Sequence, residues 1–355
     1  MQYTIQHNTY TQEELLMKAL QMQADNTVPE WEQTIWAFIY AFINPETDSF
    51  INKTSGSTGI PKEIKILKKQ AIASAQKTID FFQLKKNDRL HLCMHAKYIG
   101  AKMMVVRALI GEMQLSYSEP TSEALLKIGF PVDFCAAVPL QVQKLVEKNK
   151  EGNPFIKTLL IGGASISSSL RNVIIQQATH YYHSFGMTET ISHIALQHIN
   201  TNERFYTLLD GIAIGVDDSN CLWIDAPVIG VNHLQSNDIV ELISASQFIW
   251  QGRKDYMINS GGVKIIPELI EAKIQPLIPF PFFLSSIPDE LLGEKLILLI
   301  ESKAADVVDK KYLVESMQEI LAKYEVPKEI YVLAHFLYTE TNKIKRKETT
   351  ALINV

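Results

Sequence analysis

The chain has 355 residues, of which 46% are hydrophobic and 21% charged, and its formal net charge is -5. These values are typical of a globular protein with more than one domain, and the mild acidity creates no overall field that would attract nucleic acid or an anionic membrane surface. No run approaches the ~20 apolar residues that a membrane-spanning helix needs, and the N-terminal residues do not follow a leader pattern. The sequence therefore predicts a cytoplasmic protein without a nucleic-acid partner or membrane insertion.

The three cysteines, Cys93, Cys135 and Cys221, lie far apart, and each has apolar neighbours. No C-x-x-C spacing occurs, and the nine histidines show no metal-ligand spacing. We interpret the cysteines as buried free thiols in a reducing compartment, rather than as metal ligands or a disulfide.

Strand-like and helix-like segments alternate in the first half of the chain. A capping box of Thr11 and Glu14 opens the first predicted helix, which extends to Gln21. Helical spacing of apolar residues predicts further helices over 28–44, 68–83, 99–111 and 139–150 and within 167–178. Strands are predicted at 50–53, 88–94, 113–118, 133–138 and 157–163. This alternation is typical of βαβ units around a mostly parallel sheet.

After Thr190 the pattern changes to short strand-like segments with turn residues at 193–199, 222–230, 237–244 and 248–253, which favours an antiparallel region. From Pro267 the sequence predicts a helix at 267–274, a strand at 294–302, a helix at 307–324 and a strand at 329–336, enough for a small domain. We therefore expect an α/β protein with a large N-terminal domain, residues 1–254, and a small mobile α+β domain, residues 255–355.

A glycine-rich segment at residues 54–62 reads TSGSTGIPK and combines hydroxyl groups, unobstructed backbone N–H groups and a lysine. Such a segment, following a strand and preceding a helix, can surround phosphate oxygens. It is not a G-x-x-x-x-G-K-[ST] loop, because its two glycines are three residues apart and Glu63 stands where the magnesium-binding hydroxyl is required. The candidate phosphate ligands are Thr54, Ser55, Gly56, Ser57, Thr58, Gly59 and Lys62.

The whole nine-residue string resembles the signature loop of the adenylate-forming superfamily, which includes acyl- and aryl-CoA synthetases. Two further segments resemble motifs of that family in the expected order. The resemblance implies that Gly162, Gly163 and Ala164 lie beside adenine. It also implies that Phe185 in Ser184-Phe185-Gly186-Met187 stacks on the base, that Thr188 contacts the α-phosphate and that Glu189 holds Mg²⁺.

The remaining motifs of the family follow in the second half of the chain. The resemblance implies that Asp238 binds the ribose hydroxyls, that Arg253 approaches the ribose and phosphate, and that Asp255 is the hinge of the small domain. It also implies that Gly261 and Gly262 line the thiol's approach and that Lys343 is the catalytic lysine. The sequence departs from the family pattern at Asn237 and Asn342, each of which stands in place of a glycine.

The family chemistry has two steps and uses ATP, Mg²⁺ and coenzyme A. A carboxylate attacks the α-phosphorus of ATP to give acyl-AMP and pyrophosphate, and a thiol then displaces AMP. The resemblance implies that the small domain turns between these steps. We expect a small carboxylic acid, ATP and coenzyme A as the binding partners; monomer and homodimer both stay open.

The short length and the helix after residue 98 look most like the compact 2-succinylbenzoate:CoA ligases of menaquinone synthesis. Such a substrate has a second carboxylate that requires a cation, and Lys102 and Arg107 lie on that otherwise apolar helix. We favour Arg107, with His95 as a further pocket residue. The alternatives are a ligase for another aryl or acyl acid, a carrier-protein-loading enzyme, and a nucleotide-binding regulator that has lost its chemistry.

Overall fold

The computed structural model describes residues 2–53, 63–201, 203–303, 308–339 and 343–353. The predicted phosphate-binding residues Thr54, Ser55, Gly56, Ser57, Thr58, Gly59 and Lys62 lie outside these ranges, and so does Asn342. We refer to residues up to 254 as the large domain and to residues from 255 as the small domain.

The large domain is built on a 13-stranded sheet of mixed direction. Six neighbouring strands are parallel: β9 (His180–Gly186), β8 (Ile156–Ile161), β7 (Val132–Ala137), β5 (Arg89–Leu92), β6 (Gln114–Tyr117) and β1 (Tyr3–Ile5). An antiparallel strand, β2 (Asn8–Tyr10), closes one edge. The predicted parallel sheet is confirmed, but the β1–β2 hairpin was not predicted, because its three-residue strands are too short to show a periodic pattern.

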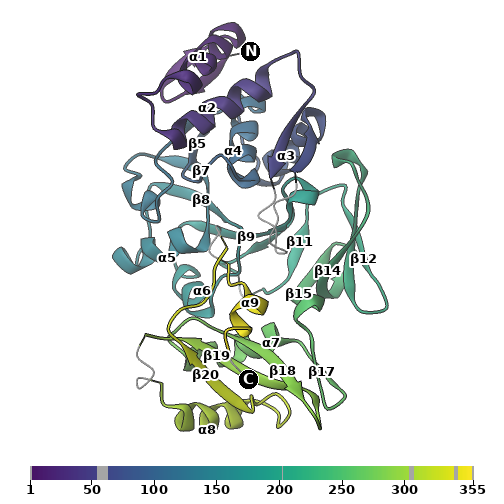
Figure 1. Cartoon of the computed structure of the whole chain (residues 1–355). Helices are drawn as coiled ribbons and strands as arrows, with labels where there is room; N and C mark the ends of the chain where they lie inside the picture. Colours follow the sequence, from purple (N-terminus) through teal and green to yellow (C-terminus); the bar gives the residue numbers. More distant parts are fainter. Residues whose placement is uncertain (1, 54–62, 202, 304–307, 340–342, 354–355) are drawn as a thin grey trace.

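The antiparallel region predicted after Thr190 is confirmed, and it continues the same sheet from β9. Its strands are β10 (His193–His198), β11 (Tyr206–Leu208), β15 (Gln247–Arg253), β14 (Val231–Ser244), β13 (Cys221–Ala226) and β12 (Ala213–Val216). Figure 1 shows these strands curving away from the parallel strands toward the lower right.

Helices pack on the faces of the sheet. They are α1 (Gln12–Ala24), α2 (Glu30–Ile43), α3 (Lys68–Phe82), α4 (Ile99–Ile110), α5 (Pro139–Lys148) and α6 (Ser168–Ile174). The predicted capping box of Thr11 and Glu14 begins α1. Helix α4 is apolar around most of its circumference, and eight consecutive or near-consecutive residues between Ala101 and Leu109 are buried, as expected for a helix inside the protein.

A separate hairpin of β3 (Ser49–Lys53) and β4 (Glu63–Leu67) flanks the glycine-rich segment. These strands pair from Ser49 opposite Leu67 to Lys53 opposite Glu63. The expectation that the segment leads into a helix is therefore corrected in one respect, since a strand of five residues precedes α3.

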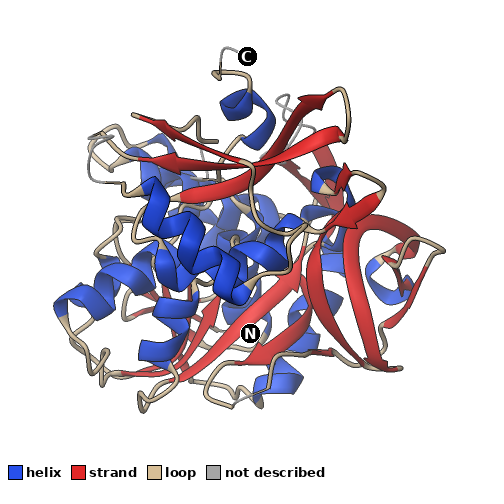
Figure 2. Cartoon of the chain, turned by 90° about the horizontal axis from the view of Figure 1, so that it is seen from below, coloured by secondary structure: helices blue, strands red, loops and turns tan. Residues whose placement is uncertain are grey.

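The small domain contains a five-stranded sheet of β17 (Val263–Ile265), β16 (Ile258–Ser260), β19 (Gly293–Glu301), β18 (Phe282–Asp289) and β20 (Glu329–Leu333). Helices α7 (Pro267–Ile274), α8 (Lys310–Ile320) and α9 (Arg346–Thr350) accompany it. The described part of the predicted helix at 307–324 is shorter than expected, because Asp309 is the N-cap and Leu321 ends it. Figure 2, seen from the small-domain end, shows strands of both sheets with helices packed against them.

The buried apolar residues fall into separate groups on the two sides of residue 255. Two clusters use residues from Tyr3 to Phe248, and two others use residues from Ile258 to Phe336. The predicted domain boundary between residues 254 and 255 lies between Phe248, where the first two clusters end, and Ile258, where the other two begin. The boundary stays a prediction. In the described part of the chain, no helix is long and apolar enough to cross a membrane, and all three cysteines are buried free thiols.

Candidate functional site

The carboxyl ends of the parallel strands β8 and β9 lie side by side, and two of the predicted motifs follow them directly. Ligands of open α/β sheets bind outside such strand ends. Gly163 has a φ of 86°, a conformation that side chains disfavour. A Cβ on Gly186 would lie 2.4 Å from the carbonyl oxygen of Ser192, so only glycine allows β9 and β10 to approach this closely.

His183 fixes the segment after β8, and sequence reasoning missed it. Its Nε2 lies 2.9 Å from the carbonyl oxygen of Ala164, and its Nδ1 lies 2.7 Å from the hydroxyl of Tyr206. Burial lowers the pKa of His183 to about 4, the charge of Arg171 lowers it further, and the Ala164 contact opposes the shift. The imidazole is therefore neutral near pH 7, and the network places its proton on Nε2, from which it donates to Ala164. A histidine in a strand carried no signal that could have identified this contact.

The predicted adenine-stacking residue, Phe185, packs against aromatic side chains of the antiparallel region. Its ring lies 5.0 Å from that of Phe248 and 5.7 Å from that of Tyr206, centroid to centroid. Ser184 donates to the carbonyl oxygen of Ile161 and thereby ties β9 to β8. The Phe185 ring is thus supported by aromatic side chains of β11 and β15.

A strained turn follows the Thr188-Glu189 motif. Ile191 has φ 65° and ψ -47°, and the N–H of Ser192 donates to the carbonyl oxygen of Thr190 over 2.7 Å, which defines a γ-turn. A β-branched residue at positive φ is rare and costs about 1 to 3 kcal/mol. The turn reverses the chain within two residues and directs Ser192 and His193 into the protein interior. No sequence pattern predicted this turn.

Glu189 is exposed in the short helix η2 (Thr188–Thr190), and among the described residues no hydrogen bond or ion pair engages its carboxylate. Mg²⁺ is commonly held by one or two carboxylates together with substrate phosphates, so a single available carboxylate fits this ion. The described residues contain no cluster of three or more His, Cys, Asp or Glu side chains suited to a metal that the protein alone would hold.

Arg107 is 1% exposed, and no ion pair engages it within the described ranges. Its Nη2 donates to Ser192 Oγ over 3.0 Å, whereas its Nε is buried without a partner. Burial lowers the pKa of Arg107 to about 9, so the guanidinium remains charged at neutral pH. Helix α4 thus carries a buried cation that contacts Ser192, three residues after Glu189, and that has no counter-charge among the described residues.

A chain of neutral groups continues from this cation. Ser192 Oγ lies 3.3 Å from His193 Nδ1, and His193 Nε2 lies 3.1 Å from Thr78 Oγ1 on α3. Burial lowers the pKa of His193 well below its usual value, and the charge of Arg107 lowers it further. His193 is therefore neutral and does not compete with Arg107 for an anion.

Lys102 and His95, the other predicted pocket residues, lie apart from this network. Lys102 Nζ donates to the carbonyl oxygen of Ile51 and to Asn52 Oδ1, at 3.1 and 3.0 Å, and burial lowers its pKa to about 8. It thereby anchors β3 one residue before the end of that strand. His95 lies in the loop before α4, where its Nδ1 accepts from the backbone N–H of Lys97. Their predicted roles in binding the acid stay predictions.

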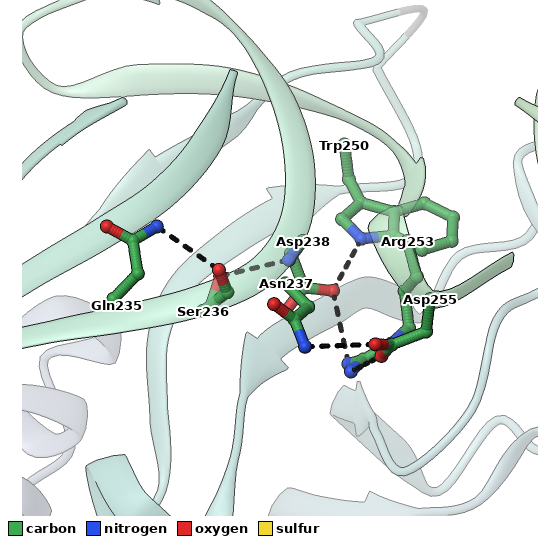
Figure 3. Close-up of polar contacts among 7 residues, drawn as sticks. All are labelled: Gln235, Ser236, Asn237, Asp238, Trp250, Arg253 and Asp255. Atoms are coloured by element: carbon green, nitrogen blue, oxygen red, sulfur yellow. Dashed lines mark hydrogen bonds and ion pairs between the residues drawn. The ribbon is translucent and has the colours of Figure 1, made fainter. Parts of the chain in front are cut away.

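Asp238 in the middle of β14, Arg253 at the end of β15 and Asp255 in the short helix η4 (Lys254–Tyr256) form one connected group (Figure 3). Asp238 is 7% exposed and accepts from Trp250 Nε1 over 2.9 Å. Arg253 lies between the two carboxylates, with its Nη1 3.7 Å from Asp238 Oδ1 and its Nη2 2.6 Å from Asp255 Oδ2. Asn237 Nδ2 donates to the other oxygen of Asp255 over 3.0 Å. The asparagine in the family's glycine position therefore contacts the predicted hinge.

Lys343 of the small domain lies within electrostatic range of this group, although no hydrogen bond or ion pair joins its side chain to it among the described residues. Part of the Lys343 side chain is exposed to solvent. Partial burial nevertheless lowers the pKa of Lys343, and the charge of Arg253 lowers it further, whereas the carboxylate of Asp238 opposes the shift. Figure 1 shows the C-terminal segment extending upward from the small domain to the large one. The charges of Arg253 and Asp238 thus act on Lys343 across the two domains.

Gly261 and Gly262 form the two-residue turn between β16 and β17, with φ values of 59° and 82°. Two successive residues at positive φ are typical of a type I′ hairpin turn, which explains the glycine pair. The N–H of Gly261 donates to the carbonyl oxygen of Leu292 within the small domain. The two glycines are separate from the group of Asp238, Arg253 and Asp255. Their role in lining the approach of the thiol stays a prediction.

A second charged cluster, also missed from the sequence, joins α7 to α9. Arg346 makes a two-point contact with Glu271, at 2.8 and 2.7 Å, and its guanidinium lies 4.8 Å from the ring centroid of Tyr256. Nearby Glu268 is half-buried, and its Oε2 has no partner. This cluster includes Tyr256, the residue after the predicted hinge, and fixes the C-terminal helix to the first helix of the small domain.

Comparison with known proteins shows to which family the chain belongs. Residues 6–213 match the family model of the AMP-binding enzyme. A crystal structure of an acyl-CoA synthetase (AMP-forming)/AMP-acid ligase II-like protein from Dyadobacter fermentans is 33% identical, with 97% of this chain and 98% of that chain covered and a TM-score of 0.63. The o-succinylbenzoate CoA synthetase of Bacillus subtilis in complex with its acyl-adenylate intermediate has a TM-score of 0.75 at 19% identity, over 86% of this chain and 69% of that chain.

A curated relative, the 2-succinylbenzoate--CoA ligase of Staphylococcus epidermidis, is 25% identical over 337 residues, which cover 86% of this chain and 70% of the relative. The family match covers more than half of the chain, and the Dyadobacter protein is similar over almost the full length of both chains. The chain therefore belongs to the AMP-binding enzyme family.

Proposed function

We propose that this chain is an ATP-dependent acid:CoA ligase that acts on an aromatic dicarboxylate of the 2-succinylbenzoate type, as in menaquinone synthesis. The family assignment supports the ligase chemistry, and curated relatives named 2-succinylbenzoate--CoA ligase support the acid. The single observation that carries the choice of a dicarboxylate is the buried, unpaired cation of Arg107. The free thiols of the chain are consistent with action in the cytoplasm.

In the first half-reaction, an oxygen of the substrate carboxylate bonds to the α-phosphorus of ATP, and the bond from that phosphorus to pyrophosphate breaks. Asp238 would accept hydrogen bonds from the ribose hydroxyls, while Lys343 and Arg253 would neutralise charge on the phosphoryl oxygens. Glu189 would hold Mg²⁺, which supplies further charge neutralisation when bound. The glycine-rich segment 54–62 would bind the distal phosphates.

In the second half-reaction, the sulfur of coenzyme A bonds to the acyl carbon, the bond from that carbon to AMP breaks, and the thiol proton is released to solvent. Lys343 has no task in this step, because no pyrophosphate leaves. We place the turning point of the small domain at Asp255, with Gly261 and Gly262 approaching the thiol after the turn. His95 and Lys102 would border the pocket.

Arg107 would pair with the carboxylate that is not activated. A buried guanidinium without a counter-charge is unfavourable, and a substrate carboxylate would relieve this cost. Because Arg107 is 1% exposed, a carboxylate reaches it only when a neighbouring side chain moves. Specificity would then arise because a monocarboxylate leaves the cation unpaired.

The test compares 2-succinylbenzoate with 4-oxo-4-phenylbutanoate, which keeps the aliphatic carboxylate and lacks the one on the ring. AMP release that depends on both acid and coenzyme A is expected with the dicarboxylate. Arg107→Met should reduce kcat/KM for the dicarboxylate about 10- to 100-fold, with little effect on the monocarboxylate or on the KM for ATP. Arg107→Lys, which retains the charge, should recover part of the loss.

Equal losses for both acids would mean that Arg107 has only a structural role. Robust pyrophosphate exchange with benzoate or an amino acid and none with 2-succinylbenzoate would contradict the proposed acid. If no acid gave AMP, the chain would instead be the nucleotide-binding regulator considered above.

A further inference from the structure

One hydrogen bond joins the small domain to a helix of the large domain at a distance from the hinge. The backbone N–H of Ser168, the first residue of α6, donates to Gln275 Oε1 over 2.6 Å. Gln275 begins the short helix η5 (Gln275–Leu277), directly after α7. Since the first N–H groups of a helix have no acceptor within it, α6 depends on acceptors from outside.

The cap of α6 is shared between the two domains. Ser167 Oγ, in the large domain, accepts from the N–H of Leu170. Gln275 accepts from the N–H of Ser168 and thereby satisfies a second donor of the first turn. The large domain thus supplies one half of the cap, and the small domain supplies the other.

This contact depends on the orientation of the small domain. Ser168 follows β8, whereas the chain enters the small domain from β15, and Figure 1 shows α6 and β15 on opposite sides of the junction. A turn about residue 255 moves Gln275 relative to α6, so the hydrogen bond cannot survive it. In the orientation that contains this bond, the C-terminal segment that carries Lys343 extends toward the large domain, and the charges of Asp238 and Arg253 act on Lys343 (Figure 1).

We propose that Gln275 is a positioning residue for acyl-AMP formation: its contact with α6 holds the small domain where Lys343 reaches the nucleotide site, and the contact breaks before the thioester step. This inference rests on the proposed two-step ligase function. It assigns to α6 the role of a docking point for the small domain in the first half-reaction.

Two substitutions at Gln275 should have opposite effects. Gln275→Ala removes the acceptor and weakens the adenylating orientation. Gln275→Glu keeps the shape and places a full negative charge at the start of α6, where a carboxylate interacts favourably with backbone N–H groups. The glutamate should therefore hold the small domain more firmly than the native glutamine.

The experiment measures the two half-reactions separately in the full chain. With 2-succinylbenzoate, Gln275→Ala should slow ATP–pyrophosphate exchange about three- to ten-fold while leaving thioester formation from supplied acyl-AMP unchanged or faster. Gln275→Glu should preserve exchange and slow the thioester step by a similar factor. Gln318→Glu, which adds the same charge at an exposed position of α8, serves as the control and should change neither rate.

A second readout does not depend on activity. Spin labels on Lys148→Cys in α5 and Lys323→Cys after α8, both exposed positions, report the distance between the domains without substrates. The population with the distance of the present structure should increase in Gln275→Glu and decrease in Gln275→Ala. If these populations shift while no acid supports exchange, Gln275 controls the domain orientation but the ligase function fails, and the role in acyl-AMP formation fails with it.

The inference is overturned if the distance populations do not respond to either substitution while the native chain shows exchange. It is also overturned if both variants slow both half-reactions equally, because a merely structural role for Gln275 would give that pattern.

Discussion

Glu268 should make the stability of the small domain depend on pH. Burial raises the pKa of Glu268 to about 7, from a usual value of 4.5; Glu271 raises it further, whereas Arg346 and backbone hydrogen bonds oppose the shift. Between these two values the native state binds more protons than the unfolded state. Protonated Glu268 therefore makes its full contribution to the free energy of unfolding below pH 4.5, and this contribution is lost as the pH rises through 7.

The size of the effect follows from the shift. A difference of about 2.5 units corresponds to about 3 kcal/mol, of which about 2.5 kcal/mol is lost between pH 5 and pH 8. Glu268→Gln keeps the shape of the protonated carboxyl group and does not titrate. The free energy of unfolding of the variant, relative to the native chain, should therefore increase by about 2.5 kcal/mol over this interval.

Urea denaturation followed by far-ultraviolet circular dichroism at pH 5, 6.5 and 8 measures this difference. Glu319→Gln, at an exposed position of α8 in the same domain, is the matched control and should show no such trend. A difference between Glu268→Gln and the native chain that stays constant from pH 5 to pH 8 would refute the reasoning. It would show that the carboxylate of Glu268 is as well stabilised in the native state as in the unfolded state.

Three further predictions concern the candidate site. Arg107→Met should raise the free energy of unfolding of the ligand-free protein by about 1 to 3 kcal/mol, because it removes a buried charge without a counter-charge. Destabilisation of this variant in urea denaturation would indicate an unrecognised counter-charge. His183→Ala should raise the KM for ATP about five- to ten-fold in pyrophosphate exchange without changing the KM for the acid, since it releases Ala164; a rise in both would contradict this role. Lys343→Ala should abolish pyrophosphate exchange and spare thioester formation from supplied acyl-AMP, and loss of both would argue against a role confined to the first step.

The fold class and the family could be predicted from the sequence because both depend on local patterns. Alternating strands and helices before Thr190 predicted the parallel sheet, and short motifs in fixed order predicted the family. The structure also joins Asp238 to Arg253, and the charges of both act on Lys343, although their sequence positions only ordered them along the chain. Their catalytic roles stay predictions.

The supporting residues could not be predicted, because their contacts join elements distant in sequence. His183 connects β9 to the segment after β8 and to β11, and each contact depends on the register of the sheet. The γ-turn at Ile191 contradicts the local preference of isoleucine and exists because the surrounding structure imposes it. Neither feature leaves a periodic or compositional pattern.

The two contacts of Asp255 determine which backbone bond of this residue could serve as the proposed pivot of the small domain. Its carboxylate accepts hydrogen bonds from Asn237 on β14 and from Arg253 at the end of β15, and both residues belong to the large domain. Rotation about the N–Cα bond of Asp255 would carry the carboxylate away from Asn237, whereas rotation about the Cα–C bond leaves it in place. The pivot that we propose at this residue would therefore be a single torsion, ψ, and the axis of the swing would follow from the direction of one covalent bond.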